Sequence, residues 1–143
     1  MKPALLDTDT LSEVIKGRDA ELQEKALQYL TEHGYFTFSI ITRYEILRGL
    51  MSKGAARQIA LFDERCARSE ILLFTEEIVV NAAGIYADLS RKGQLIMDAD
   101  ILIAASALVH GLVLVTGNTD HFKRIPDLSI ENWRTPISSK STK

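Results

Sequence analysis

The sequence is poor in the residues and segments that define several classes of protein. Cys66 is the only cysteine among 143 residues, so a framework of internal disulfides is excluded. No apolar stretch approaches the roughly 20 residues that a membrane-spanning helix needs. The first residues also lack the basic segment and following apolar run of a secretory signal. We therefore expect a cytoplasmic protein that makes no membrane contact.

An excess of positive charge is missing as well. The chain has 17 Lys and Arg against 19 Asp and Glu, which gives a net charge of −2 and an isoelectric point of about 5.9. Proteins that hold nucleic acid through a general basic surface are usually strongly basic, so that mode of binding is disfavoured. The balance of charge still permits an acidic pocket that meets a phosphate group through a divalent cation.

The chain does have enough apolar material for one domain and a regular alternation of elements. Hydrophobic residues make up 46% and charged residues 25%, which are ordinary values for a globular domain of this length. Runs rich in β-branched and aromatic residues alternate with segments of helical periodicity. The pattern predicts strands near 4–6, 35–41, 71–74, 112–116 and 128–130, and helices near 10–15, 19–33, 42–51, 55–69, 75–91 and 98–110.

This alternation predicts an α/β fold. Strands separated by helices form a central parallel sheet that helices cover on both faces. We find no internal repeat and no linker, so one domain is expected over residues 1–134. Residues 135–143 have the composition of a polar tail.

Acidic and amide side chains lie at the ends of the predicted elements. Most of them come just after a strand, at the edge of the sheet where ligands of parallel α/β folds bind. Clustered carboxylates repel one another unless a hard cation such as Mg²⁺ or Mn²⁺ neutralises them. Because Mg²⁺ keeps several waters, one or two acids would bind it directly and the others would hold its waters. The candidates are Asp7, Glu45, Asp98, Asp100, Asn118 and Asp120.

Several of these residues also have a purely structural interpretation. Glu45 fits a capping box with Thr42, and Thr10 fits one with Glu13. Asp98 and Asp9 fit helix N-caps, and Asp120 fits a turn. The histidines are expected to be structural: His33 and His110 at helix ends, and His121 in a loop. Asp100 fits an acid that the helix dipole favours in the first turn, but it directly precedes the apolar run ILIAA and is therefore expected to face a cleft.

Four segments, taken together, resemble a known family. LLDTDTLS, SIITRYEILRGL, MDADILIAASAL and LVLVTGNTDHFKRIPDL occur in this order and spacing. They resemble PIN-domain ribonucleases, and most closely the VapC toxins of bacterial and archaeal toxin–antitoxin systems. The resemblance runs from Leu5 to about Trp133, so residues 1–134 would form the PIN domain. It implies a PIN-like α/β/α sandwich and endonucleolytic cleavage of RNA that depends on Mg²⁺ or Mn²⁺.

By position, the resemblance also assigns a site. Asp7, Glu45 and Asp100 match the first three acids of the family, with Asp7 and Asp100 expected to hold the metal. The fourth acid is replaced by Asn118, and Asp120 could substitute for it. We expect the Asn118 amide to accept a hydrogen bond from a metal-bound water and to donate one to a neighbouring carboxylate.

The resemblance further implies partners. VapC-like proteins typically form homodimers, and a VapB-like antitoxin neutralises them by laying its C-terminal segment across the active-site groove. An acidic pocket would suit an Arg or Lys of such a partner. The substrate would be RNA, for which transfer RNA is common in the family. The apolar segments Ile46–Met51 and Leu61–Ala67 also exceed what one small sheet needs, which favours a homodimer.

Two other functions are compatible with parts of the sequence. LLDTDTLS also matches the opening of haloacid-dehalogenase phosphatases, in which Asp7 would be the nucleophile and Asp9 the acid/base. That family requires a second pair of Asp residues at the end of a later strand, but the Asp98–Asp100 pair opens a helix and follows no clear strand. The presence of Asn118 in place of the family's fourth acid favours a different alternative, a catalytically degenerate PIN domain that only binds RNA or protein.

Overall fold

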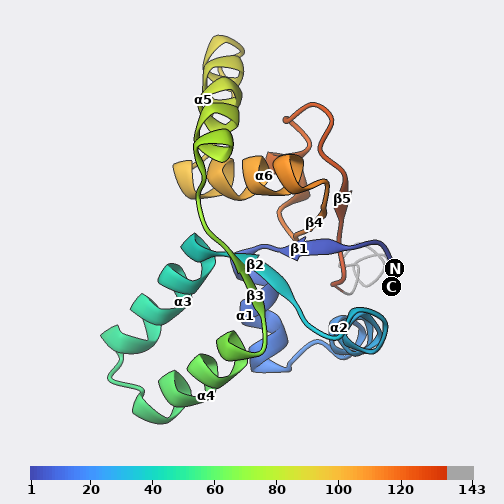
Figure 1. Ribbon diagram of the computed structural model, residues 1–143, viewed down its shortest axis with the longest axis vertical. Helices are drawn as coiled ribbons and strands as arrows, with labels where there is room; N and C mark the ends of the chain where they lie inside the picture. The colour runs from blue at the N-terminus through green and yellow to red at the C-terminus, as the bar shows by residue number, and fades with distance from the viewer. Residues whose placement is uncertain (135–143) are drawn as a thin grey trace, which may run out of the picture.

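A computed structural model describes residues 1–134 of the chain. These residues form a five-stranded sheet in the order β3-β2-β1-β4-β5, and every strand pairing in it is parallel (Figure 1). The α/β prediction with a central parallel sheet is therefore confirmed. In chain order the elements are β1 (Ala4–Leu6), α1 (Thr8–Lys16), α2 (Ala20–His33), β2 (Thr37–Ser39), α3 (Ile40–Ser52), α4 (Ala56–Ala67), β3 (Glu70–Leu72), α5 (Glu76–Arg91), α6 (Asp98–His110), β4 (Val113–Val115), α7 (Thr119–Phe122) and β5 (Ile130–Glu131).

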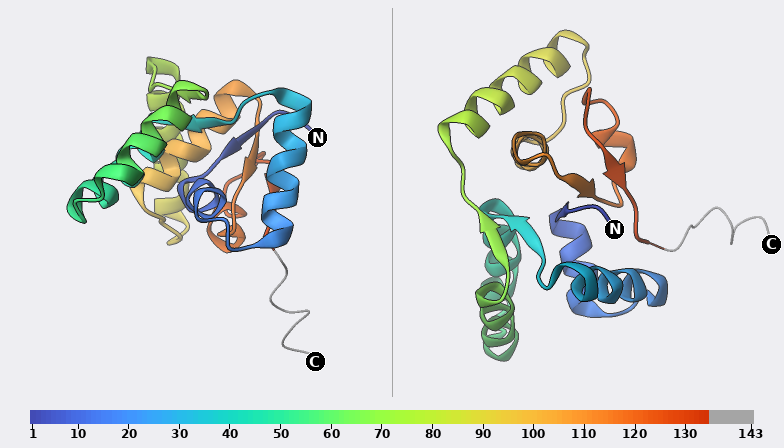
Figure 2. Two further views of the ribbon diagram at one scale, coloured as in Figure 1. Left: turned by 90° about the horizontal axis from the view of Figure 1, so that it is seen from below. Right: turned by 45° about the vertical axis from the view of Figure 1, so that its right-hand side comes forward.

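The central strand shows why the sheet needs helices on both faces. Successive side chains of a strand point to opposite faces. Leu6 of β1 therefore joins the core beneath α1, α2, α3 and α4, whereas Leu5 joins the core beneath α5, α6 and α7. Both leucines are 0% exposed. Figures 1 and 2 show the two groups of helices on opposite sides of the strands.

Two helices begin earlier than their capping signatures predict. The first starts at Thr8, because Asp7 is its N-cap and accepts a hydrogen bond from the Thr10 amide at 2.8 Å. The third starts at Ile40, because the Ser39 hydroxyl accepts from the Ile41 amide at 3.2 Å. Both predicted capping boxes are therefore wrong. The residue that follows β1 and the last residue of β2 cap these helices instead.

Other element bounds differ by small amounts. The strand predicted at 35–41 is shortened to Thr37–Ser39, since its last two residues belong to α3. The short helix α7 was not predicted, whereas α6 has the bounds that the sequence predicts. None of the described helices is both long and apolar enough to cross a membrane. The predicted tail at 135–143 lies outside the described residues.

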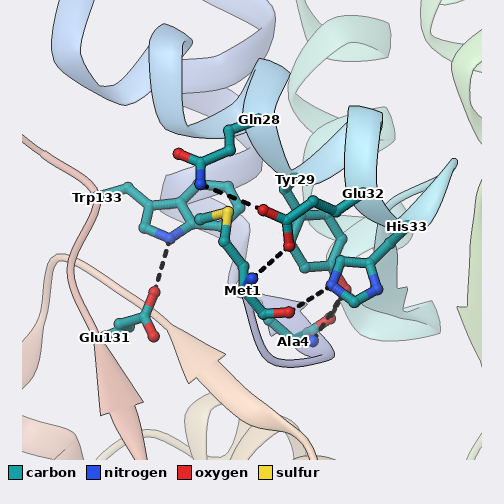
Figure 3. A network of polar contacts seen from close by, with 8 residues as sticks. All are labelled: Met1, Ala4, Gln28, Tyr29, Glu32, His33, Glu131 and Trp133. Carbon is teal, nitrogen blue, oxygen red and sulfur yellow. Dashed lines mark hydrogen bonds and ion pairs between the residues drawn. The ribbon is translucent and has the colours of Figure 1, made fainter.

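A polar network holds the amino-terminal end of the central strand (Figure 3). The buried Tyr29 hydroxyl accepts from the Ala4 amide at 2.9 Å and donates to the Ala4 carbonyl at 3.3 Å. Its ring lies 5.7 Å from the ring of Trp133, whose indole donates to Glu131 of β5 at 3.1 Å. These contacts join α2, β1 and the residues after β5. They lie at the opposite end of β1 from Asp7.

Candidate active site

Asp7 is a buried carboxylate at the carboxyl end of the central strand. Its side chain is 4% exposed and bonds to the Thr10 amide and to the hydroxyls of Thr10 and Thr116. Burial raises the pKa of Asp7 above its usual value, and these hydrogen bonds offset only part of that rise. The groups that bond to the Asp7 carboxylate are all neutral, so its negative charge is not balanced by a positive one.

Glu45 is held by a relay of hydroxyl groups. It lies in the second turn of α3 rather than the first, because that helix begins at Ile40. Thr8 donates to the Glu45 carboxylate at 2.7 Å, so the Thr42 hydroxyl, 2.9 Å from that of Thr8, is the donor to Thr8. The residue that sequence analysis paired with Glu45 therefore acts on it through Thr8. This relay connects α3 to the start of α1.

Asp100 lies in the first turn of α6 and faces the other acids. Partial burial, and then the charges of Asp7 and Glu45, raise its pKa from 3.8 to about 6. Asp98, in contrast, is exposed and is the first residue of the helix, while Met97 occupies the N-cap position. The predicted capping role of Asp98 is therefore wrong.

Asn118 follows β4 and is positioned through its backbone and its side chain. Its amide N–H donates to the buried Thr116 hydroxyl at 2.9 Å. Its side-chain nitrogen lies 2.8 Å from Nδ1 of His121, one turn along α7. The expected hydrogen bond from this amide to a carboxylate is thus replaced by one to an imidazole.

These side chains line one cavity of about 370 Å³, which we call the acidic cavity. Its lining residues are Asp7, Thr8, Asp9, Glu45, Arg48, Met97, Asp100, Asn118 and His121. Of the sequence-predicted site residues, the structure brings Asp7, Glu45, Asp100 and Asn118 together here. Asp120 is not among the lining residues: its side chain is 83% exposed and pairs with Lys123 at 3.2 Å.

The acidic cavity is chemically suited to a hard divalent cation. Its carboxylates supply oxygen ligands. Burial is the main cause of the raised pKa values of Asp7 and Asp100, and the charges of Asp7 and Glu45 add to the rise at Asp100, so a cation here would stabilise the ionised groups. No three of the described acidic, His or Cys side chains are grouped closely enough to hold a metal ion. Mg²⁺ needs only one or two direct carboxylates, with water as its other ligands. This donor set is compatible with a cation that Asp7 and Asp100 would bind directly and whose water Glu45 would hold.

Four polar side chains of this cavity are not among the site residues that the sequence predicts: Thr8, Asp9, Arg48 and His121. Arg48 lies three residues after Glu45 on α3, so helical spacing could have placed both on one face. Thr8 adjoins Asp7 in the sequence. His121 was interpreted as a loop residue, and only the α7 turn, which was not predicted, brings it beside Asn118.

The raised pKa of Asp100 predicts a pH-dependent gain in stability when its charge is removed. The folded state binds this proton more tightly than the unfolded state, so ionisation destabilises the fold as pH rises from about 4 to above 6. Without divalent cations, Asp100→Asn should therefore melt higher at pH 8, by roughly 3 °C if partial exposure reduces the effect to about 1 kcal/mol.

Thermal melting in EDTA at pH 8 and pH 4.5 measures this effect. The gain should shrink at pH 4.5, where Asp100 carries its proton in the folded state. Asp98→Asn is the matched control, because it removes the same charge from an exposed position two residues earlier. Equal gains from both substitutions, or no gain at pH 8, would contradict the prediction.

The parallel α/β/α sandwich and its acidic cavity define a PIN-type nuclease domain, and a family model for the PIN domain matches residues 4–128. Curated relatives give a finer assignment. The chain is 35% identical over 130 residues to "Ribonuclease VapC2" of Haemophilus influenzae, covering 90% of this chain and 96% of the relative. It is 32% identical over 130 residues to "tRNA(fMet)-specific endonuclease VapC" of Salmonella typhimurium, with the same coverage. The chain therefore belongs to the PIN-domain family, in its VapC group of toxin–antitoxin ribonucleases.

Solved structures of VapBC complexes share the fold. DNA-bound VapBC from Salmonella typhimurium superposes with a TM-score of 0.82 at 31% identity, covering 93% of this chain and 99% of that one. VapBC2 from Rickettsia felis, bound to a promoter DNA fragment, gives a TM-score of 0.80 at 28% identity, covering 91% and 98%. The PIN-like sandwich that the sequence predicts is confirmed.

Proposed function

We propose that this chain is a metal-dependent endoribonuclease that cleaves phosphodiester bonds in RNA, with transfer RNA as a candidate substrate. The observation that carries the proposal is the meeting of Asp7, Glu45 and Asp100 in one cavity at the carboxyl edge of the sheet. Asp7 and Asp100 would hold Mg²⁺, or Mn²⁺ in its place. The relative from Salmonella typhimurium, described as specific for tRNA(fMet), supports transfer RNA as the first substrate to test.

The residues of the acidic cavity would have different roles in such a reaction. A bound divalent cation would polarise the phosphodiester and lower the pKa of a coordinated water. Glu45, held by Thr8, is placed to accept a proton from the attacking water. Arg48 contributes positive charge at the same cavity, where the RNA backbone must enter.

Mapping of RNA 5′ ends after induced expression tests this function. We expect new 5′ ends at a few defined sites in the wild type, and none with Asp7→Asn. Purified protein should cleave RNA and should not hydrolyse p-nitrophenyl phosphate, which separates it from the phosphatase alternative. RNA binding without cleavage in Mg²⁺ or Mn²⁺ would instead indicate a degenerate PIN domain.

A VapB-like antitoxin is the proposed regulatory partner. Among the solved relatives are VapBC complexes and a "toxin-antitoxin complex from Klebsiella pneumoniae". This chain has a groove of about 450 Å³ between α1, α3 and α4 that combines apolar side chains with basic ones. An amphipathic segment with acidic residues would fit it. The lining includes Ile15, Ile46, Leu50, Leu61, Phe62, Lys53, Arg65 and Arg68.

A homodimer is also proposed. Of the two apolar segments singled out in the sequence, the first leaves Met51 61% exposed, and on α5 Val80 is 61% exposed; neither side chain lines the groove proposed for the antitoxin. Large exposed apolar side chains on several helices are typical of an interaction surface. Light scattering of the purified chain at micromolar concentration should give about twice the chain mass of 16.0 kDa. A mass of one chain under those conditions would contradict the dimer.

A further inference from the structure

Asn118 and His121 form a fixed pair on one wall of the acidic cavity. The backbone of Asn118 is bonded to Thr116, and Phe122, next to His121, is 0% exposed and anchors the α7 turn in the core. The side-chain nitrogen of Asn118 lies 2.8 Å from Nδ1 of His121. The orientation of the imidazole is therefore set from both ends of the turn.

This contact determines which ring nitrogen carries the proton. The nitrogen of a carboxamide is only a donor, so Nδ1 of His121 must be the acceptor and must lack a hydrogen. A neutral imidazole has one N–H, which is therefore on Nε2. Nε2 has no hydrogen-bond partner among the described residues. The ring thus offers the acidic cavity an N–H group.

Such donors are scarce in this cavity. Asp7, Asp9, Glu45 and Asp100 are acceptors, and the Thr8 hydroxyl is already used on Glu45. A phosphodiester that enters brings further acceptor oxygens. Beyond the Asn118 amide, which is engaged with His121, the side-chain N–H donors among the lining residues are those of Arg48 and His121.

We propose that His121 binds the substrate by donating a hydrogen bond from Nε2–H to a non-bridging oxygen of the scissile phosphate, and that Asn118 is the positioning residue that fixes this tautomer. The proposal rests on the proposed nuclease function. It gives the residue at the fourth position a purpose in the neutral state of the ring, since an aspartate there would accept from Nδ1–H of a neutral His121 and leave Nε2 without its hydrogen.

The same geometry separates phosphate binding from metal binding. A ring nitrogen that bears hydrogen has no lone pair for a cation, so His121 is not a metal ligand in this tautomer. The reversed amide, with its oxygen toward Nδ1–H, would free the Nε2 lone pair for a metal. The two arrangements therefore predict opposite tautomers and opposite responses to Mg²⁺.

Imidazole ¹⁵N chemical shifts of the full-length protein test the tautomer without any cleavage assay. At a pH where the ring is neutral, we expect His121 to have its hydrogen on Nε2 in the wild type and on Nδ1 in Asn118→Asp. Loss of the signals in His121→Gln assigns them. Addition of Mg²⁺ should leave the shifts typical of the Nε2–H tautomer. A wild-type ring protonated on Nδ1, or a Mg²⁺-induced change to a deprotonated Nε2, would overturn the proposal.

Cleavage kinetics test the contact with the phosphate. His121→Ala should lower kcat/KM for RNA roughly 10- to 100-fold, the usual effect of losing a hydrogen bond to a charged group. His121→Gln, which keeps an N–H donor, should recover part of the loss. The matched control is His110→Ala, an exposed histidine at the far end of α6. All three variants should melt close to the wild type.

The outcomes distinguish this proposal from the proposed function. If the wild type cleaves no RNA in Mg²⁺ or Mn²⁺, both the nuclease function and the His121 contact are refuted. If the wild type cleaves RNA and His121→Ala has the same kcat/KM as the wild type, only the His121 contact is refuted. A loss in His121→Ala without any recovery in His121→Gln would contradict the role of the N–H donor.

Discussion

Asp7→Asn is expected to reduce RNA cleavage by roughly 100-fold or more and to leave the fold intact. Loss of a group that only supports a metal ligand typically costs 10- to 100-fold, and Asp7 is proposed as a direct ligand. The fold should survive because Asn is as good an N-cap as Asp, so the hydrogen bond from the Thr10 amide can persist. Removal of a buried, desolvated carboxylate should if anything raise the melting temperature.

A matched control for this substitution exists on the next helix. Asp19 is the N-cap of α2 and accepts from the Leu22 amide at 3.1 Å, so Asp19→Asn makes the same change at a cap that does not line the acidic cavity. Single-turnover cleavage of RNA by both purified variants measures the difference. Cleavage by Asp7→Asn near the rate of Asp19→Asn would refute the assignment of Asp7.

Removal of divalent cations should stop cleavage altogether. In excess EDTA the rate should fall to background, and Mg²⁺ or Mn²⁺ should restore it. Zn²⁺ should restore it poorly, because the carboxylates of the cavity are hard oxygen ligands and Zn²⁺ favours nitrogen and sulfur. The same titration followed by thermal melting should show Mg²⁺ stabilising the wild type more than Asp100→Asn.

Copurified nuclease is the main confounder of that experiment. A parallel preparation of Asp7→Asn, carried through every step, sets the background rate. Activity of the wild type that persists undiminished in excess EDTA, above this background, would exclude a metal-dependent mechanism.

Much of the fold follows from local patterns in the sequence. The helix α6 has its predicted bounds because an apolar run is closed by Gly111, which adopts a positive φ of 65°. Starts of helices are harder to predict, because several polar residues in a row can each serve as the cap. In LLDTDTLS, the sheet pairing of β1 ends at Leu6, so the helix begins directly after it. Asp7, rather than Asp9 or Thr10, is therefore the N-cap.

The candidate site is predictable to the extent that parallel strands bring their carboxyl ends together. That rule is enough to place Asp7, Glu45 and Asn118 at one edge of the sheet from their positions in the sequence. It does not choose between Asn118 and Asp120, because the choice depends on a single turn of helix. Asn118, at the N-cap position of α7, and His121 within it line the cavity, whereas Asp120 is exposed and pairs with Lys123.

The position of β1 in the middle of the sheet has a consequence for synthesis of the protein. Its partner on one side is β4, in which Val113 pairs with Ala4, so the sheet cannot close until most of the chain exists. Asn118 and His121 come later still. A nascent chain on the ribosome therefore carries Asp7 and Glu45 without the neighbours that complete the cavity. Any ribonuclease activity that depends on the acidic cavity must therefore await synthesis and folding of β4 and α7, more than 100 residues after Asp7 has been made.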